Sequence, residues 1–192
     1  SKDYFNIAED GNVNVTTRPS QPGSSIKIVN YTYALSNGFT PASILDDSPV
    51  AFSVPGQPIY IPKNYDNHYR GRMSLRNAFA ESRNIPAVKV LTTYGVSKMI
   101  EEGRIMGITT WDDPSRFGLS LTLGGGEVKL IDLARVYATI AGGGIRPQVK
   151  SILGIKDYKS KSLDSGDPFG LNKPEPVVDP RVAYIITDIL KD

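Results

Sequence analysis

Clusters of glycine and proline divide this chain into short segments and limit what it can fold into. The run Arg18-Pro19-Ser20-Gln21-Pro22-Gly23 disfavours regular structure, and Asn37-Gly38 and Gly142-Gly143-Gly144 are typical helix ends. The 192 residues include 18 Gly and 14 Pro, a share above that of an average globular protein. We therefore expect short elements joined by many loops.

Between these breaks, apolar residues at helical spacing predict several helices. The predicted helices cover residues 24–36, 74–81, a segment after Asn84 that ends before Gly95, 97–106, 127–141 and, after Pro180, 181–190. Alternation of polar and apolar residues predicts a short strand over 12–17, and a second strand is expected over 147–155. The segment 160–176 is interpreted as a surface loop.

The ionisable residues exclude several classes of function. Lys and Arg number 22 against 20 Asp and Glu, and a net charge of +2 gives no reason to expect nucleic acid or an anionic membrane as a partner. With no Cys and one His, the chain has neither a thiol nucleophile nor a multi-histidine metal site. No apolar run approaches the length of about 18 residues that a membrane helix needs. We expect no cofactor and no metal.

The segment Ser24-Ser25-Ile26-Lys27 breaks a local rule at a predicted helix start. A capping serine usually has Glu or Gln three residues later, whereas here that position holds Lys27, whose charge opposes the helix dipole. Residues three apart share one helix face, and burial there lowers the pKa of a lysine. Ser24 and Lys27 are therefore a candidate nucleophile and base, although a solvent-exposed cap beside a surface lysine is the simpler interpretation of these four residues taken alone.

Ser82-Arg83-Asn84 lies in a short loop between two predicted helices. Locally, Ser82 ends one helix and Asn84 is expected to cap the next. A hydroxyl and an amide two residues apart can also face one cleft, where they relay a proton and hold a substrate amide. Ser82 and Asn84 are therefore further candidate catalytic residues.

Several blocks of the sequence together resemble the transpeptidase domain of class A, bifunctional penicillin-binding proteins. The blocks occur in the order of that family and are Arg18 to Lys27 around the active serine, Tyr60 to Asp66, Ser74 to Val88 with its Leu-Arg-x-Ala-x-x-x-Ser-x-Asn pattern, and Leu123 to Gly144. The resemblance implies a mixed α/β (α+β) fold, in which this chain is the helix-rich part and the central antiparallel sheet is incomplete. The family's third motif, Lys-Thr/Ser-Gly, does not occur in the sequence.

The resemblance also implies an activity and the residues that perform it. Ser24 would form an acyl-enzyme with a peptidoglycan stem peptide ending in D-Ala-D-Ala, Lys27 would be its base, Ser82 would relay a proton, and Asn84 would hold the substrate amide. β-Lactams would acylate the same serine. Residues 1–192 are then expected to be one partial transpeptidase domain, truncated before the third motif and inactive alone, from a membrane-anchored protein at the outer face of the bacterial cytoplasmic membrane. A companion chain could supply the missing strand.

Three other interpretations stay open. The chain could be a non-catalytic scaffold or interaction fragment. It could be a serine β-lactamase, in which Glu127 or the pair Asp112-Asp113 activates water, although Glu127 also suits a first helical turn and Asp112-Asp113-Pro114 a plain turn. A triad with His68 and Asp66 is a third possibility, although His68 lies in a polar loop. Arg70, Arg72 and Arg76 are interpreted as a solvated basic face.

Overall fold

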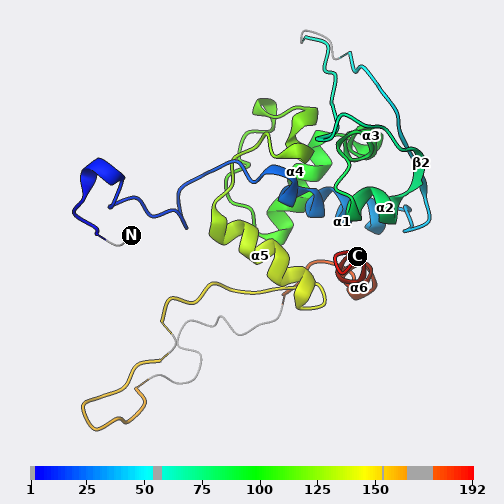
Figure 1. The fold of residues 1–192 in the computed structure, drawn as a ribbon. Coiled ribbons are helices and arrows are strands. Elements are labelled where there is room, and N and C mark those ends of the chain that lie inside the picture. Colours follow the sequence, from blue (N-terminus) through cyan, green and yellow to red (C-terminus); the bar gives the residue numbers. More distant parts are fainter. Residues whose placement is uncertain (1–2, 54–57, 153, 164–174) are drawn as a thin grey trace.

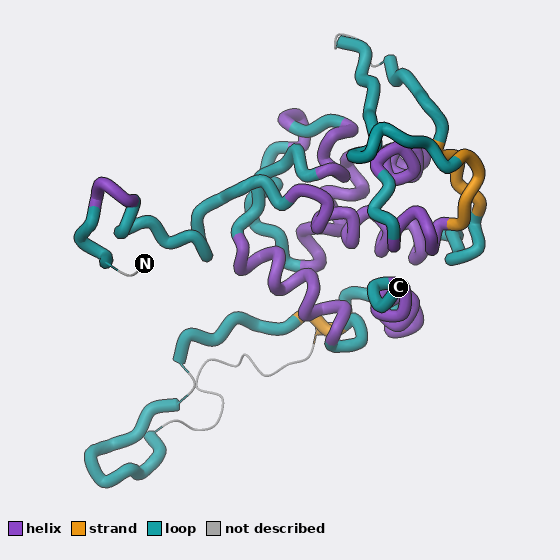
Figure 2. The backbone as a smooth tube through the Cα atoms, in the orientation of Figure 1, coloured by secondary structure: helices purple, strands orange, loops and turns teal. Residues whose placement is uncertain are grey.

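The computed structural model describes residues 3–53, 58–152, 154–163 and 175–192. Its helices form one group from which three segments extend: the N-terminal residues, the segment between β1 and β2, and the segment after α5 (Figures 1 and 2). The α-helices are α1 (Lys27–Ser36), α2 (Leu75–Ala80), α3 (Asn84–Tyr94), α4 (Val96–Met106), α5 (Leu130–Ala141) and α6 (Pro180–Ile189). The 3-10 turns are η1 (Ile7–Glu9), η2 (Gly23–Ile26), η3 (Pro114–Arg116) and η4 (Leu119–Leu123).

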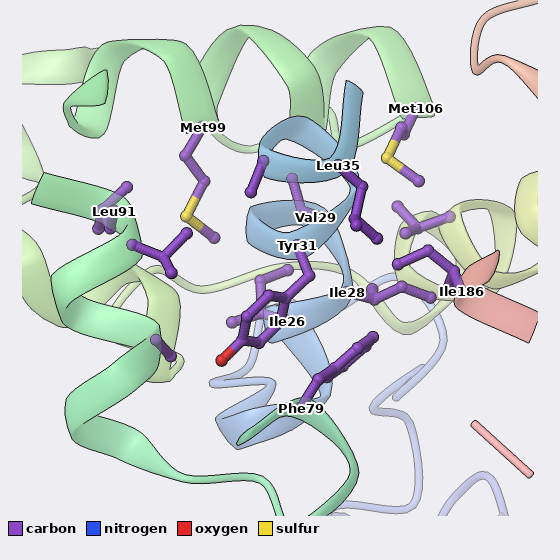
Figure 3. Packing of buried hydrophobic residues seen from close by; sticks show 14 of the residues in the cluster. Ile26, Ile28, Val29, Tyr31, Leu35, Phe79, Leu91, Met99, Met106 and Ile186 are labelled. Carbon is purple, nitrogen blue, oxygen red and sulfur yellow. The ribbon is translucent and has the colours of Figure 1, made fainter. Parts of the chain in front are cut away.

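Helix α1 is the centre of the hydrophobic core. Eight of its ten residues are buried, and α3, α4 and α6 all contact it. Figure 3 shows Ile28 beside Ile186 of α6, Val29 beside Met99 of α4, and the Tyr31 ring against Phe79. A helix with apolar residues on every side is stable only when other elements enclose it, and this enclosure fixes the position of its first turn.

The strands form two small antiparallel pairs. β1 (Ile44–Asp47) pairs with β2 (Gly71–Ser74), with Leu45 opposite Met73, and both of these side chains are buried. β3 (Ile145–Arg146) pairs with β4 (Glu175–Pro176). The β1–β2 pair leads directly into α2, whose first turn is capped by the Ser74 hydroxyl accepting the Asn77 amide at 3.2 Å.

The sequence predicts the helices better than the strands. All six predicted helices are present, and the first begins with a 3-10 turn. The helix expected from Glu127 begins instead at Leu130, because Val128 is extended and pairs with Ser20. Residues 12–17 form turns rather than a strand, since the Asn14 carboxamide accepts the Thr16 amide at 3.0 Å. No strand forms in the described part of 147–155, and much of 160–176 lies outside the described residues.

Asn30, one turn after Lys27, connects three elements inside the core. The side chain is fully buried, and its Nδ2 donates to the Ala87 carbonyl of α3 at 2.8 Å and to the Thr122 hydroxyl of η4 at 2.7 Å. Its Oδ1 accepts the Tyr94 hydroxyl. The Asn30 carboxamide thus holds α1, α3 and η4 in one arrangement.

Replacement of Asn30 by alanine should lower the free energy of unfolding by about 1–3 kcal/mol, because it leaves buried polar partners without a hydrogen bond. Denaturant unfolding followed by circular dichroism measures this loss. Asn37→Ala is the matched control, since Asn37 is exposed at the end of the same helix, and it should change the value by no more than about 0.5 kcal/mol. Equal effects from both variants would contradict the role of Asn30.

Candidate active site

Ser24 lies in the 3-10 turn that precedes α1. Its side chain is exposed, and the Lys27 amide donates to its carbonyl. The turn is held from two sides: the Tyr137 hydroxyl of α5 donates to the Ser25 carbonyl at 3.0 Å, and Gly124 packs against the Gly23 backbone. A Cβ at Gly124 would lie 2.4–2.8 Å from Gly23 backbone atoms, so only glycine permits this approach.

The amine of Lys27 binds the Ser82–Asn84 loop. The side chain is fully buried, and Nζ donates to the Ser82 carbonyl at 2.6 Å, to the Ser82 hydroxyl at 3.1 Å and to Asn84 Oδ1 at 2.7 Å. Three acceptors match the three hydrogens of an ammonium group. The structure therefore brings Lys27, Ser82 and Asn84 together, one helical turn from Ser24. The Ser24 hydroxyl itself has no hydrogen-bond partner within the part of the chain that the structure describes.

The surroundings of Lys27 make its amine easier to deprotonate. Burial lowers the pKa of Lys27 from 10.5 to about 8, with the nearby positive charge of Arg83 as a second cause. At neutral pH most of the amine is still protonated, and the neutral form becomes available as the pH approaches 8. This is the range in which an amine can act as a base toward a hydroxyl.

The Ser82–Asn84 loop has a specific and strained backbone. Ser82 has a φ of 53°, in the left-handed region that few residues other than glycine adopt. Asn84 does not cap α3, contrary to expectation, because its Oδ1 accepts Lys27 and its Nδ2 donates to the Lys63 carbonyl at 2.8 Å. The capping acceptor is Asn64, whose Oδ1 accepts the Asn84 amide at 2.9 Å and the Ile85 amide at 3.3 Å.

The residues that support this loop were not among the candidates predicted from the sequence. Asn64 and Asp47 are buried, and Arg83 is only 6% exposed. Arg83 lies in the Ser82-Arg83-Asn84 segment and Asn64 in the Tyr60–Asp66 block, but neither segment indicates a supporting role for these side chains, and their partners lie 17–36 residues away. Local sequence patterns do not predict contacts between residues so far apart in the chain.

The alternative catalytic groups do not form the arrangements that the alternative interpretations require. The exposed His68 ring contacts the Asp66 backbone carbonyl at 2.7 Å, whereas the Asp66 carboxylate binds Arg83, so the structure forms no triad around His68. Glu127 is exposed and precedes α5 rather than lying in its first turn, and Asp113 caps η3.

The remaining sequence features have structural explanations. Arg70 pairs with Glu81, and Arg76 pairs with Asp188 and Asp192, so most of the basic face is paired. Over the described residues, no group of three His, Cys, Asp or Glu side chains is arranged to hold a metal ion. Likewise, none of the helices described is long and apolar enough to cross a membrane.

Comparison with known proteins identifies the family to which this chain belongs. The family of the penicillin binding protein transpeptidase domain matches residues 5–192, and the chain belongs to this family. Penicillin-binding protein 1A of Neisseria meningitidis is 34% identical over 178 residues, which are 90% of this chain and 22% of that protein. Penicillin-binding protein 1A of Rickettsia typhi is 34% identical over 182 residues, 93% of this chain and 22% of that protein.

A solved structure supports the same assignment. Penicillin-binding protein 1A from Haemophilus influenzae superimposes with a TM-score of 0.83 at 28% sequence identity, over 95% of this chain and 31% of that one. The expected mixed α/β fold and the resemblance to class A penicillin-binding proteins are thereby confirmed. The chain spans about a fifth of the length of the curated relatives it matches.

The first prediction from the site concerns the protonation of Lys27. Its amine should titrate with a midpoint near pH 8, measured by 13C NMR of lysine Cε. The exposed Lys98 beside Glu101, whose ion pair raises its pKa, is the control and should titrate at a higher pH. A Lys27 midpoint above 10 would contradict the prediction.

The lowered pKa of Lys27 also makes the stability of the folded chain depend on pH. The unfolded chain holds the Lys27 proton more tightly than the folded chain does, so Lys27 opposes folding below pH 8. This penalty decreases as the pH rises from about 8 toward 10.5.

Proposed function

We propose that this chain is the nucleophile-bearing part of a class A D,D-transpeptidase that cross-links peptidoglycan stem peptides. The observation that carries the proposal is the convergence of the buried Lys27 amine with Ser82 and Asn84, one helical turn from the exposed Ser24. Family membership gives the class of reaction. The geometry gives each residue a position that suits a role in acyl transfer.

The first half of the proposed reaction forms an acyl-enzyme. Ser24 Oγ attacks the carbonyl carbon between the two D-alanines, and its proton passes to the neutral Lys27 amine. The amide at the start of the 3-10 turn contributes to stabilising the oxyanion. The carbon–nitrogen bond then breaks, and the Ser82 hydroxyl, 3.1 Å from Lys27 Nζ, relays the proton to the leaving D-alanine nitrogen.

The second half transfers the acyl group. The amine of a second stem peptide attacks the Ser24 ester carbon and loses a proton to the Lys27–Ser82 pair. The new amide forms as Ser24 Oγ leaves and regains a proton. Among the residues that the structure describes, Asn84 Nδ2 donates only to the Lys63 carbonyl, and its second hydrogen would bind a substrate carbonyl.

The proposal extends to location and inhibitors. Peptidoglycan substrates place the working protein in the bacterial cell envelope, on the outer side of the cytoplasmic membrane, as part of a membrane-anchored protein. β-Lactams carry a strained amide in place of the D-Ala-D-Ala bond and would acylate Ser24. The Lys-Thr/Ser-Gly strand that the family uses would come from a further part of the protein or from a companion chain.

Ser24→Ala should abolish covalent labelling by a fluorescent penicillin, because the attacking oxygen is removed. The protein is taken at its full natural length, and intact mass spectrometry counts the adducts. Ser25→Ala is the matched control and should keep the label, since the Ser25 hydroxyl only donates to the Pro22 carbonyl at 2.6 Å. Labelling that persists in Ser24→Ala would refute the assignment.

The lifetime of the adduct separates the proposal from the β-lactamase alternative. After removal of free penicillin, the adduct should persist over hours rather than hydrolyse within seconds. Rapid turnover of the antibiotic by the same protein would favour the β-lactamase.

The 192 residues alone should label slowly or not at all, because the sequence lacks the Lys-Thr/Ser-Gly tripeptide that would bind the substrate carboxylate. The labelling rate of this chain is compared with that of the full-length protein at equal concentration. Stoichiometric labelling within minutes would show that these residues form a sufficient site. The non-catalytic scaffold alternative predicts no labelling in either sample.

A further inference from the structure

We propose that Arg83, the middle residue of the Ser82-Arg83-Asn84 loop, is a positioning residue for this transpeptidase. Through a buried network with Asp47, Asp66 and Asn64, it holds the loop in the conformation that presents the Ser82 oxygens and the Asn84 carboxamide to Lys27. The inference rests on the proposed acylation of Ser24 and adds a group that does not touch the substrate.

The Arg83 guanidinium is held by every nitrogen it has. Nε donates to Asp47 Oδ2 at 2.9 Å, Nη1 donates to Asp66 Oδ2 at 2.9 Å, and Nη2 donates to the His68 carbonyl. Arg83 is 6% exposed and Asp47 is fully buried. A buried ion pair is stable only when its remaining polar atoms are also satisfied, and this one meets that condition.

Asp47 and Asn64 complete the network. Asp47 Oδ1 accepts Asn64 Nδ2 at 2.7 Å, and Oδ2 also accepts the Arg70 amide at 3.0 Å. The same Asn64 side chain uses its Oδ1 to hold the Asn84 amide at 2.9 Å. The end of β1, the segment 64–70 and the α2–α3 loop are thereby fixed to one another.

This network is directly coupled to the strained residue of the site. Ser82 has a φ of 53°, a conformation that costs a non-glycine residue free energy and persists only when its surroundings impose it. Ser82 accepts a hydrogen bond from Lys27 through its carbonyl, and the next residue, Arg83, is anchored in the network. Arg83 is therefore placed to impose the backbone turn at Ser82.

Arg83 also acts on Lys27 through its charge. Its positive charge is the second cause, after burial, of the lowered pKa of Lys27. The other charged and titratable groups around the network are Asp47, Asp66, the exposed His68 and the buried Tyr31 hydroxyl, whose pKa burial and Asp47 raise. Removal of the Arg83 charge leaves Asp47 uncompensated, and both changes raise the Lys27 pKa.

The test compares acylation rates of Arg83→Gln and Arg83→Lys, in the full-length protein with fluorescent penicillin across pH 6–10. Arg83→Gln should slow acylation by about 10- to 100-fold, because catalytic groups are misplaced. The acidic limb of its pH–rate profile, where acylation slows as Lys27 becomes protonated, should also lie at higher pH than in the wild type. Arg83→Lys keeps the charge but not the fork of donors, so it should be slower than the wild type with its limb unmoved. Arg116→Gln, on an exposed arginine, is the matched control and should behave as the wild type.

The outcomes separate a positioning role from a structural one. A purely structural defect reduces the fraction of protein that is labelled but leaves the acidic limb in place. An unmoved limb or a wild-type rate in Arg83→Gln would therefore overturn the proposal. If Arg83→Gln does not fold, the double variant Arg83→Gln/Asp47→Asn, which has no uncompensated buried carboxylate, decides by its rate: slow acylation supports the proposal and wild-type acylation overturns it.

The failure of the proposed function gives a different result. In that case the wild type itself is not labelled at Ser24, whatever residue 83 is. The 13C NMR titration of Lys27 then tests Arg83 without acylation: the midpoint should rise in Arg83→Gln and stay near the wild-type value in Arg83→Lys. Equal midpoints in all three proteins would overturn the inference.

Discussion

The hydrogen bonds of the buried Lys27 amine are the interaction on which the rest of this structure depends. An amine in the interior must have acceptors, and all three come from a loop more than fifty residues further along the chain. Helix α1 brings the amine to this loop because the core encloses that helix. The packing of apolar residues around α1 therefore also brings the residues of the site together.

Two buried asparagines perform similar tasks in the elements around this interaction. Asn30 binds α1 to α3 and η4 from within the core, and Asn64 binds the start of α3 to the segment before β2. Each uses both ends of a carboxamide, donor and acceptor, to join segments that apolar contacts alone would leave free to slide. The region around Lys27 is thus fixed by directional hydrogen bonds as well as by close packing.

Local patterns in the sequence predicted the parts of the fold that local forces determine. Apolar spacing and a glycine or proline boundary located α1, α3 and α6, and the spacing of Ser24 and Lys27 indicated a shared helix face. The strand predicted over residues 12–17 was wrong because the Asn14 side chain competes with strand pairing for backbone amides. The network of Asp47, Arg83 and Asn64 could not be predicted from the sequence, because its members lie 17–36 residues apart and only the tertiary fold brings them together.

The left-handed backbone at Ser82 limits which residue can provide the hydroxyl group there. Threonine carries the same functional group, but its branched β-carbon is poorly accommodated at positive φ. Cysteine and serine differ in chemistry but not in this steric respect. Backbone geometry, rather than the reactivity of the side chain, therefore narrows the set of residues that this position accepts.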